Sequence, residues 1–221
     1  MAAKNQEQTF QIPAPHIETF KIRIQGTAPI IFHQWSEKAI KMMLDKQMKK
    51  ASTGREAKDP EKLYRNSFYL NSQGQIGFPA RNIKQAMVGA SRFLTGVPMT
   101  FLRGSIFVWA TTPQKETWGK KEELIPILID GKPATLSDKT IMADTVIDGI
   151  AGVDSKNKHI QMRRDMVRIG MGVSDVCFRG QIDEWEMEFY IQFLADKLSM
   201  EQVLNLLQYA GFSQGLGEWR P

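Results

Sequence analysis

The stretch 184–194 constrains the fold of this chain more than any other. Apolar side chains fill every second position, and polar side chains fill most of the positions between them. The apolar positions are Trp185, Met187, Phe189, Ile191 and Phe193. A period of two is typical of a β-strand with one buried face. The stretch 19–25 alternates in the same way, and strands of this kind are typical of antiparallel sheets covered on one face.

Capping signals predict three helices. Ser36 can cap a helix that runs to about residue 50. A second helix, about 80–94, follows Pro79, which suits a first helical turn because it has no N–H to leave unpaired. Ser199 with Gln202 three residues later forms a capping box. The helix that this box opens is expected to end at Gly211. The core faces of the last two helices are Ile83, Met87, Ala90 and Leu94, and Val203, Leu206, Leu207 and Ala210.

Turn signals organise the middle of the chain. A turn at 71–74 predicts a hairpin between 67–70 and 75–78. Further strands are expected at 104–111 and 124–129.

Periodicity is lost in the stretch 131–158, where turn formers and charges alternate, and this predicts a long loop or insertion. We interpret 176–179 and 184–194 as an antiparallel pair turned at Gly180. The order of elements predicts an α+β fold with helices on one face of an antiparallel sheet.

Composition limits the classes of protein to consider. The 221 residues, 42% of them hydrophobic, suit one large domain, and the net charge of +5 permits a nucleic-acid partner. Cys177 is the only cysteine, which fits a reducing compartment, and the polar stretch 1–11 lacks an apolar signal core. We therefore expect a cytoplasmic protein. Pro13 and Pro15 interrupt both helix and strand pairing, which predicts a mobile arm at 1–17. One cysteine and three histidines are too few for a zinc site, and no metal, cofactor or membrane partner is expected.

Four pieces of the chain, in this order, resemble the RAMP superfamily, the ferredoxin-like RNA-binding proteins of CRISPR effector complexes. The stretch 20–32 resembles the family's first strand with its Gly-x-x-Pro break, and 75–84 resembles its strand-to-helix entry. The stretch 181–193 is similar to its long strand, and 214–218 to the start of its glycine-rich loop. These pieces cover about a third of the chain. Pro221 comes where the family pattern has a closing strand.

The resemblance implies a ferredoxin-like (RRM-like) domain over 18–221, with insertions at about 33–66 and 95–160. It also implies single-stranded RNA binding by a subunit that assembles along its ligand, with single-stranded DNA as the alternative ligand. We interpret the chain as a non-catalytic binder of phage or cellular origin.

Clustered cations and glycine turns supply the candidate contacts. Cations on one surface neutralise phosphates and release counterions, while an exposed aromatic ring can stack on a base. Arg81 and Lys84 lie near the expected start of a helix, where amides favour an anion. The predicted contacts are Arg81, Lys84, Lys156, Lys158, Arg163, Arg164, Arg168, Gly215, Gly217, Trp219 and Arg220. The lysines of the first helix, Lys38, Lys41, Lys49 and Lys50, are a weaker set with solubility as the competing role.

Two alternatives remain open. The chain could be a metal-independent endoribonuclease with His33 as general base, since some RAMP endonucleases place a histidine after the first strand. Asp144 and Asp148 could bind a metal or act in cleavage, although aspartates in loops are usually turn formers. The second alternative is an assembly protein that uses the same fold to form an oligomer without nucleic acid.

Overall fold

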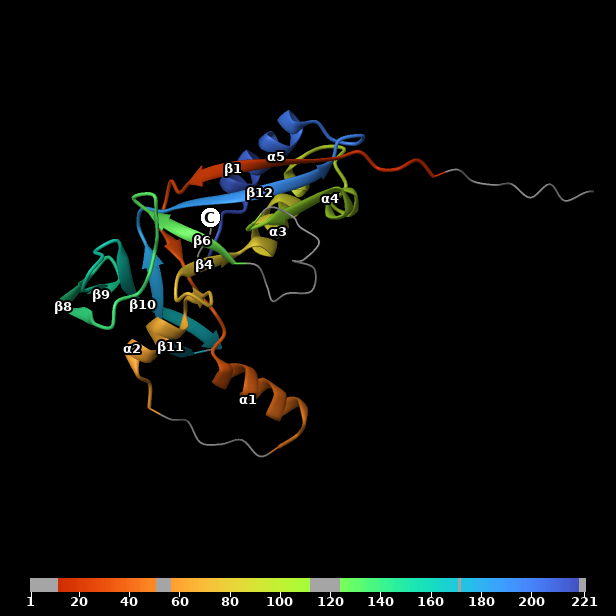
Figure 1. The fold of residues 1–221 in the computed structure, drawn as a ribbon. Helices are drawn as coiled ribbons and strands as arrows, with labels where there is room; N and C mark the ends of the chain where they lie inside the picture. Colours follow the sequence, from red (N-terminus) through yellow and green to blue (C-terminus); the bar gives the residue numbers. More distant parts are fainter. Residues whose placement is uncertain (1–11, 51–56, 112–123, 171, 219–221) are drawn as a thin grey trace, which may run out of the picture.

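The computed structural model describes residues 12–50, 57–111, 124–170 and 172–218. Within these ranges the chain forms two antiparallel sheets and five α-helices, so the prediction of an α+β fold is confirmed. The predicted single sheet is replaced by two (Figure 1).

The first sheet is built around β12 (Glu186–Leu194). β1 (Ile17–Gln25) pairs with it along its whole length, from Ile17 opposite Leu194 to Gln25 opposite Glu186. The other edge of β12 pairs with β5 (Ile106–Trp109) and β6 (Leu124–Ile129). The sheet is completed by β4 (Ile76–Pro79), β3 (Tyr69–Leu70) and β7 (Lys132–Pro133).

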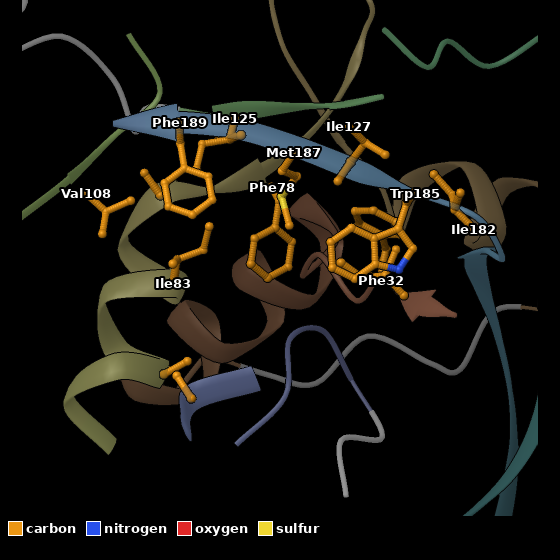
Figure 2. Close-up of a cluster of buried hydrophobic side chains, with 14 of the residues drawn as sticks. Phe32, Phe78, Ile83, Val108, Ile125, Ile127, Ile182, Trp185, Met187 and Phe189 are labelled. Atoms are coloured by element: carbon orange, nitrogen blue, oxygen red, sulfur yellow. The ribbon is translucent and has the colours of Figure 1, made fainter. Parts of the chain in front are cut away.

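Helices cover one face of this sheet. α3 (Ala80–Ala90) packs against α5 (Met200–Ser213), and both bury the small and branched side chains that the sequence places at helical spacing. The short α4 (Met99–Ser105) and a 3-10 turn (Ser91–Phe93) link α3 to β5. Figure 2 shows Met187 and Phe189 of β12 in the same buried cluster as Ile83 of α3. Every second side chain of β12 is buried, and these side chains form the part of the core that faces the helices.

The second sheet has the strand order β2 (Ile30–Ile31), β11 (Val173–Ile182), β10 (Ile160–Gly170), β9 (Ile150–Asp154) and β8 (Thr140–Ile147). α2 (Pro60–Asn66) packs against β11. α1 (Glu37–Gln47) has no buried residue, and it lies below the rest of the chain in Figure 1.

The chain passes between the sheets at residues 26–29. The Trp185 ring fills the space where Gly26 would carry a side chain, and its indole N–H donates to the Ala28 carbonyl at 2.9 Å. The two strands that the sequence analysis joined across this break, β1 and β2, therefore belong to different sheets.

Local capping and turn signals are confirmed. The Ser36 hydroxyl accepts from the Ala39 amide, and Ser199 and Gln202 form the complete capping box. Asn71 accepts from the amides of Gln73 and Gln75, which closes the turn between β3 and β4.

Four expectations were wrong. The stretch 131–158 contains β8 and β9 instead of a long loop. Gly180 lies inside β11, which pairs with β10 and β2 and not with β12. Helix α5 continues through Gly211 to Ser213, and α3 begins at Ala80, directly after Pro79 as expected, but ends at Ala90 instead of about residue 94. In each case strand pairing or packing far along the chain decided the outcome.

Of the predicted arm at 1–17, residues 1–11 lie outside the described ranges. Residues 12–16 are exposed and have no regular structure, while Ile17 begins β1. No helix in the ranges given above is long and apolar enough to span a membrane.

Candidate nucleic-acid interface

The hairpin formed by β10 and β11 carries three of the predicted contacts on its two faces. Cross-strand pairs run from Ile160 opposite Ile182 to Arg168 opposite Ser174. Since side chains alternate along a strand, Arg164 and Arg168 share one face, and Arg163 lies on the other. The structure therefore separates Arg163 from the other two arginines.

The Arg164 face begins in the core and ends in solvent. Ile160 and Met162 are fully buried near the first sheet, whereas Arg164, Met166 and Arg168 are exposed, with Met166 at 80%. No acidic side chain in the described ranges pairs with Arg164 or Arg168. Two exposed arginines thus flank an exposed apolar side chain on one strand.

The opposite face holds a network of paired charges. Arg163 Nε donates to Asp165 Oδ1 at 2.8 Å, and its Nη1 donates to Gln181 Oε1 at 3.1 Å. Arg179, only 5% exposed, lies between Asp165 at 3.5 Å and Glu218 at 3.4 Å. Arg163 is therefore part of a protein-internal network.

The glycine loop at the C-terminal end packs against β2. The Glu218 amide donates to the Ile31 carbonyl at 2.9 Å, and a Cβ on Gly217 would lie 2.7 Å from that same oxygen. The Gly215 amide donates to the Ala210 carbonyl at 3.0 Å, where it helps to end α5. Gly217 therefore has a packing role, and Gly215 has a positive φ of 62° after the end of α5. Trp219 and Arg220 lie outside the described residues.

Lys156 and Lys158 are exposed in the turn between β9 and β10. Asp154, which is buried, shapes this turn by accepting hydrogen bonds from the amides of Lys156 and Asn157 at 2.9 Å. Its other oxygen accepts from the amide and hydroxyl of Ser137. Burial raises the pKa of Asp154, but these hydrogen bonds outweigh it and hold the pKa below its usual value.

Arg81 and Lys84 lie on α3, against the first sheet. The Lys84 ammonium stands 3.8 Å from the centre of the Phe107 ring, a cation–π contact, and burial lowers its pKa. Arg81 is exposed. The structure does not bring this pair together with the hairpin arginines.

The exposed face of the first sheet balances its own charges. Lys21 lies 2.6 Å from Glu188, and Arg23 pairs with Glu186. Its cations are therefore neutralised by neighbouring acids, unlike those on the outer hairpin.

The lysines of the α1 region are exposed, namely Lys38, Lys41, Lys49 and Lys50. Asp144 is exposed on β8, and Asp148 occupies the turn to β9 with a φ of 53°. Within the described part of the chain, no group of three or more histidine, cysteine, aspartate or glutamate side chains could hold a metal ion.

His33 follows β2 and borders a pocket of about 290 Å³. This pocket lies between the start of α1, α2 and β11, and it is also lined by Lys58, Arg179 and Cys177. Lys58 and Arg179 were not among the contacts predicted from the sequence. No local signal marks them, because Lys58 is brought to β11 from 117 residues away.

No family model, curated protein or solved structure matches this chain.

Proposed function

We propose that this protein is a non-catalytic binder of single-stranded nucleic acid, with RNA as the ligand, and that the strand lies along the outer hairpin face. One observation carries the proposal: Arg164 and Arg168 are exposed, lack acidic partners in the described ranges, and stand on either side of exposed Met166. Lys156 and Lys158 add exposed cations at the base of β10.

The physical basis is electrostatic. Cations that contact phosphates release condensed counterions, so the affinity falls as salt rises. Arginine presents a planar fork of donors that matches phosphate oxygens. An apolar side chain between two such cations offers a contact for a base, which would make binding tolerant of sequence.

A RAMP-like, ferredoxin-like core is part of the same proposal. Along the chain, β1 is followed by α3, then by β5 and β12, and then by α5. In the first sheet, β12 pairs with β1 on one edge and with β5 on the other. With β3, β4, β6 and β7 of the same sheet treated as additions, these elements follow the β-α-β-β-α order of a split βαβ fold, which supports this part of the proposal. The connection between β5 and β12 contains β6 and β7 of the first sheet and β8 to β11 of the second, and thus the hairpin.

Assembly along the ligand, in the cytoplasm, completes the proposal. α1 and its C-cap residue Met48 expose apolar side chains, Ile40, Leu44 and Met48, beside the lysines, and such a surface suits contact with a neighbouring subunit. Sedimentation with and without a long RNA tests this part, and a monomer in both conditions would contradict it.

The principal experiment is fluorescence anisotropy with a labelled 30-nucleotide RNA across a salt series. Replacing Arg164 and Arg168 with alanine is expected to weaken binding and to reduce the slope of log affinity against log salt by about 1.4, or about 0.7 for each lost phosphate contact. Arg103→Ala on α4 is the matched control, because it removes an exposed arginine far from the hairpin (Figure 1). Affinity that is independent of salt, or equal losses in both variants, would contradict the proposal. An unlabelled DNA of the same sequence, used as competitor, decides between RNA and DNA.

The non-catalytic part is tested separately. Labelled RNA incubated with the wild-type protein is expected to stay intact. Cleavage that disappears in His33→Ala would show instead that the chain is a ribonuclease.

A further inference from the structure

α1 carries an apolar stripe that the described part of the chain does not bury. Ile40, Met43 and Leu44 lie on one face at helical spacing, and the C-cap residue Met48 continues this face. All four side chains are exposed, and none of the helix residues is buried. A helix of 11 residues is marginal on its own in water, since most helix stability in proteins comes from the packing of an apolar face. A second surface that covers the stripe would therefore stabilise α1.

Lysines border this stripe and make it positively charged. α1 and the three residues after it contain five lysines and two acids. Lys50 lies 3.4 Å from Asp45, whereas Lys41, Lys46 and Lys49 are exposed and form no ion pair with a described residue. The stripe thus suits an apolar surface with negative charge. Repulsion between like charges disfavours the pairing of two α1 helices with each other.

β8 presents an apolar, acidic surface at the edge of the second sheet. It pairs with β9 on one side, and its other edge has no partner strand in the described ranges. Ile141, Met142 and Ile147 are each more than half exposed. Asp144 and Asp148 are exposed and form no ion pair in the same ranges, and neither β8 nor its turn to β9 contains a basic residue. An apolar edge strand of this kind can associate with another chain unless a helix or loop covers it.

The two surfaces are complementary, but they lie apart in one molecule. Figure 1 shows α1 below the rest of the chain and β8 at the left edge of the second sheet. An 11-residue helix is about 17 Å long and an eight-residue strand about 26 Å, so α1 can lie along β8 over its full length. A contact between them requires two copies of the chain.

We infer that α1 of one copy covers β8 of the next copy, with the apolar stripe against the exposed isoleucines and the lysines beside Asp144 and Asp148. This inference deepens the assembly part of the proposed function and rests on it. Because the two surfaces differ, the contact is head to tail and leaves a free α1 and a free β8 at the ends, so further copies can add. The contact area is small, and a bound RNA that holds copies side by side strengthens the contact by raising their effective concentration.

Two variants, each with one surface blocked, test this pairing in sedimentation velocity without RNA. Leu44→Asp places an acid in the α1 stripe, and Ile141→Asn removes an apolar side chain from β8. Each variant alone is expected to raise the protein concentration at half assembly at least tenfold. An equimolar mixture is expected to form dimers and nothing longer, because one intact α1 and one intact β8 can meet only once. Leu204→Asp, at an exposed position of α5, is the matched control and is expected to assemble like the wild type.

A charge exchange tests the electrostatic part. Lys46→Glu and Asp144→Lys are each expected to weaken assembly at least fivefold, because an acidic α1 then meets an acidic β8, or a basic α1 meets a basic β8. A mixture of these two variants is expected to regain assembly, since each then finds the opposite charge on the other. Unfolding curves that match the wild type establish that every variant is folded.

The outcomes separate this inference from the proposed function. Assembly of the wild type that is unchanged in Leu44→Asp and Ile141→Asn overturns the inference and leaves RNA binding in place. Dimers formed by Ile141→Asn alone would show that two α1 surfaces pair, which also overturns it. A wild type that stays monomeric at every concentration, and on a long RNA, overturns it as well. Assembly that depends on both surfaces, together with no RNA binding in the anisotropy series, supports the inference and contradicts the proposed function.

Discussion

His33 Nδ1 lies 2.5 Å from Oε2 of Glu218, although the two residues are 185 positions apart in the chain. The other carboxylate oxygen of Glu218 lies 3.4 Å from the buried Arg179. One carboxylate therefore joins the C-terminal loop to the segment after β2 and to β11. The Glu218 amide strengthens this link through its hydrogen bond to Ile31.

Glu218→Ala is expected to lower the free energy of unfolding by about 1–3 kcal/mol, because Arg179 would lose a carboxylate partner in a buried position. His33→Ala alone removes the more exposed partner of the His33–Glu218 contact, so its effect on the free energy of unfolding is expected to be smaller. A double-mutant cycle by urea denaturation is expected to give a coupling of about 1 kcal/mol between His33 and Glu218. Glu201→Ala, at an exposed position of α5, is the control. Additive effects of the two substitutions would show that the contact does not stabilise the fold.

Asp154 predicts an acid-dependent loss of stability. Its pKa is held below the ordinary value of 3.8 in the folded protein: burial raises the pKa, and the hydrogen bonds from Ser137, Lys156 and Asn157 lower it by more. A depressed folded pKa stabilises the protein above the unfolded pKa, and this contribution is lost as the pH falls through the folded pKa.

At pH 7, Asp154→Asn is expected to cost about 2–4 kcal/mol, because the amide group cannot accept the two hydrogen bonds that one carboxylate oxygen receives. The difference in the free energy of unfolding between wild type and variant should narrow below pH 4, because protonation of Asp154 removes the charged form that the hydrogen bonds stabilise. Urea denaturation from pH 7 to pH 3 measures this. Asp138→Asn, exposed in the same segment, should show no such change. A gap that stays constant over this range would contradict the assignment.

The side chain of Tyr64 places a hydroxyl group inside the hydrophobic core. The residue is 0% exposed, its hydroxyl has no hydrogen-bond partner in the described ranges, and burial raises its pKa. The ring packs edge-on against Phe68 at 5.3 Å between centres. Tyr64→Phe keeps this contact and removes the unpaired group, so it is expected to stabilise the protein by about 1 kcal/mol. Tyr209→Phe, half-exposed on α5, is expected to change nothing measurable in thermal unfolding. A clear loss of stability in Tyr64→Phe would indicate a hydrogen bond that the hydroxyl makes.

The elements that could be predicted from the sequence are those with one buried face or with a cap formed by residues close together in the chain. β12 and β1 alternate because helices cover one face of their sheet, and the caps of α1 and α5 depend on residues three positions apart. β8 was missed because its residues are exposed on both faces for most of its length, so no alternation marks it as a strand.

The candidate sites were less predictable than the fold. Arg164 and Arg168 were found as cations, but their separation from Arg163 depends on the register of β10 and β11. The pocket joins Lys58 to Val176 across 118 positions, and only the strand pairing brings them together. Charge clusters in a sequence therefore predicted candidate contacts without predicting which face each one occupies.

Gly180 shows why a glycine can mislead a sequence analysis. It was expected to form a turn, yet it lies within β11, two residues before the end of the strand, and its amide donates to the Ser67 hydroxyl at 2.7 Å. A Cβ at this position would lie 2.0 Å from Cζ of Phe68, well inside van der Waals contact. The glycine is required because an aromatic ring of the core lies directly against the strand.

Gly180→Ala is therefore expected to destabilise the protein by about 3 kcal/mol, at the upper end of overpacking effects, since Phe68 is fully enclosed and cannot move aside freely. Gly170→Ala is the matched control: it also lies in a strand of this hairpin, and a Cβ there meets no atom within 4 Å. Urea denaturation should show a change within about 0.5 kcal/mol for Gly170→Ala. Adding Phe68→Leu to Gly180→Ala should cost less than the sum of the two single substitutions, because the smaller side chain leaves room for the methyl group. Equal effects of the two glycine substitutions would mean that the Phe68 ring does not restrict this position.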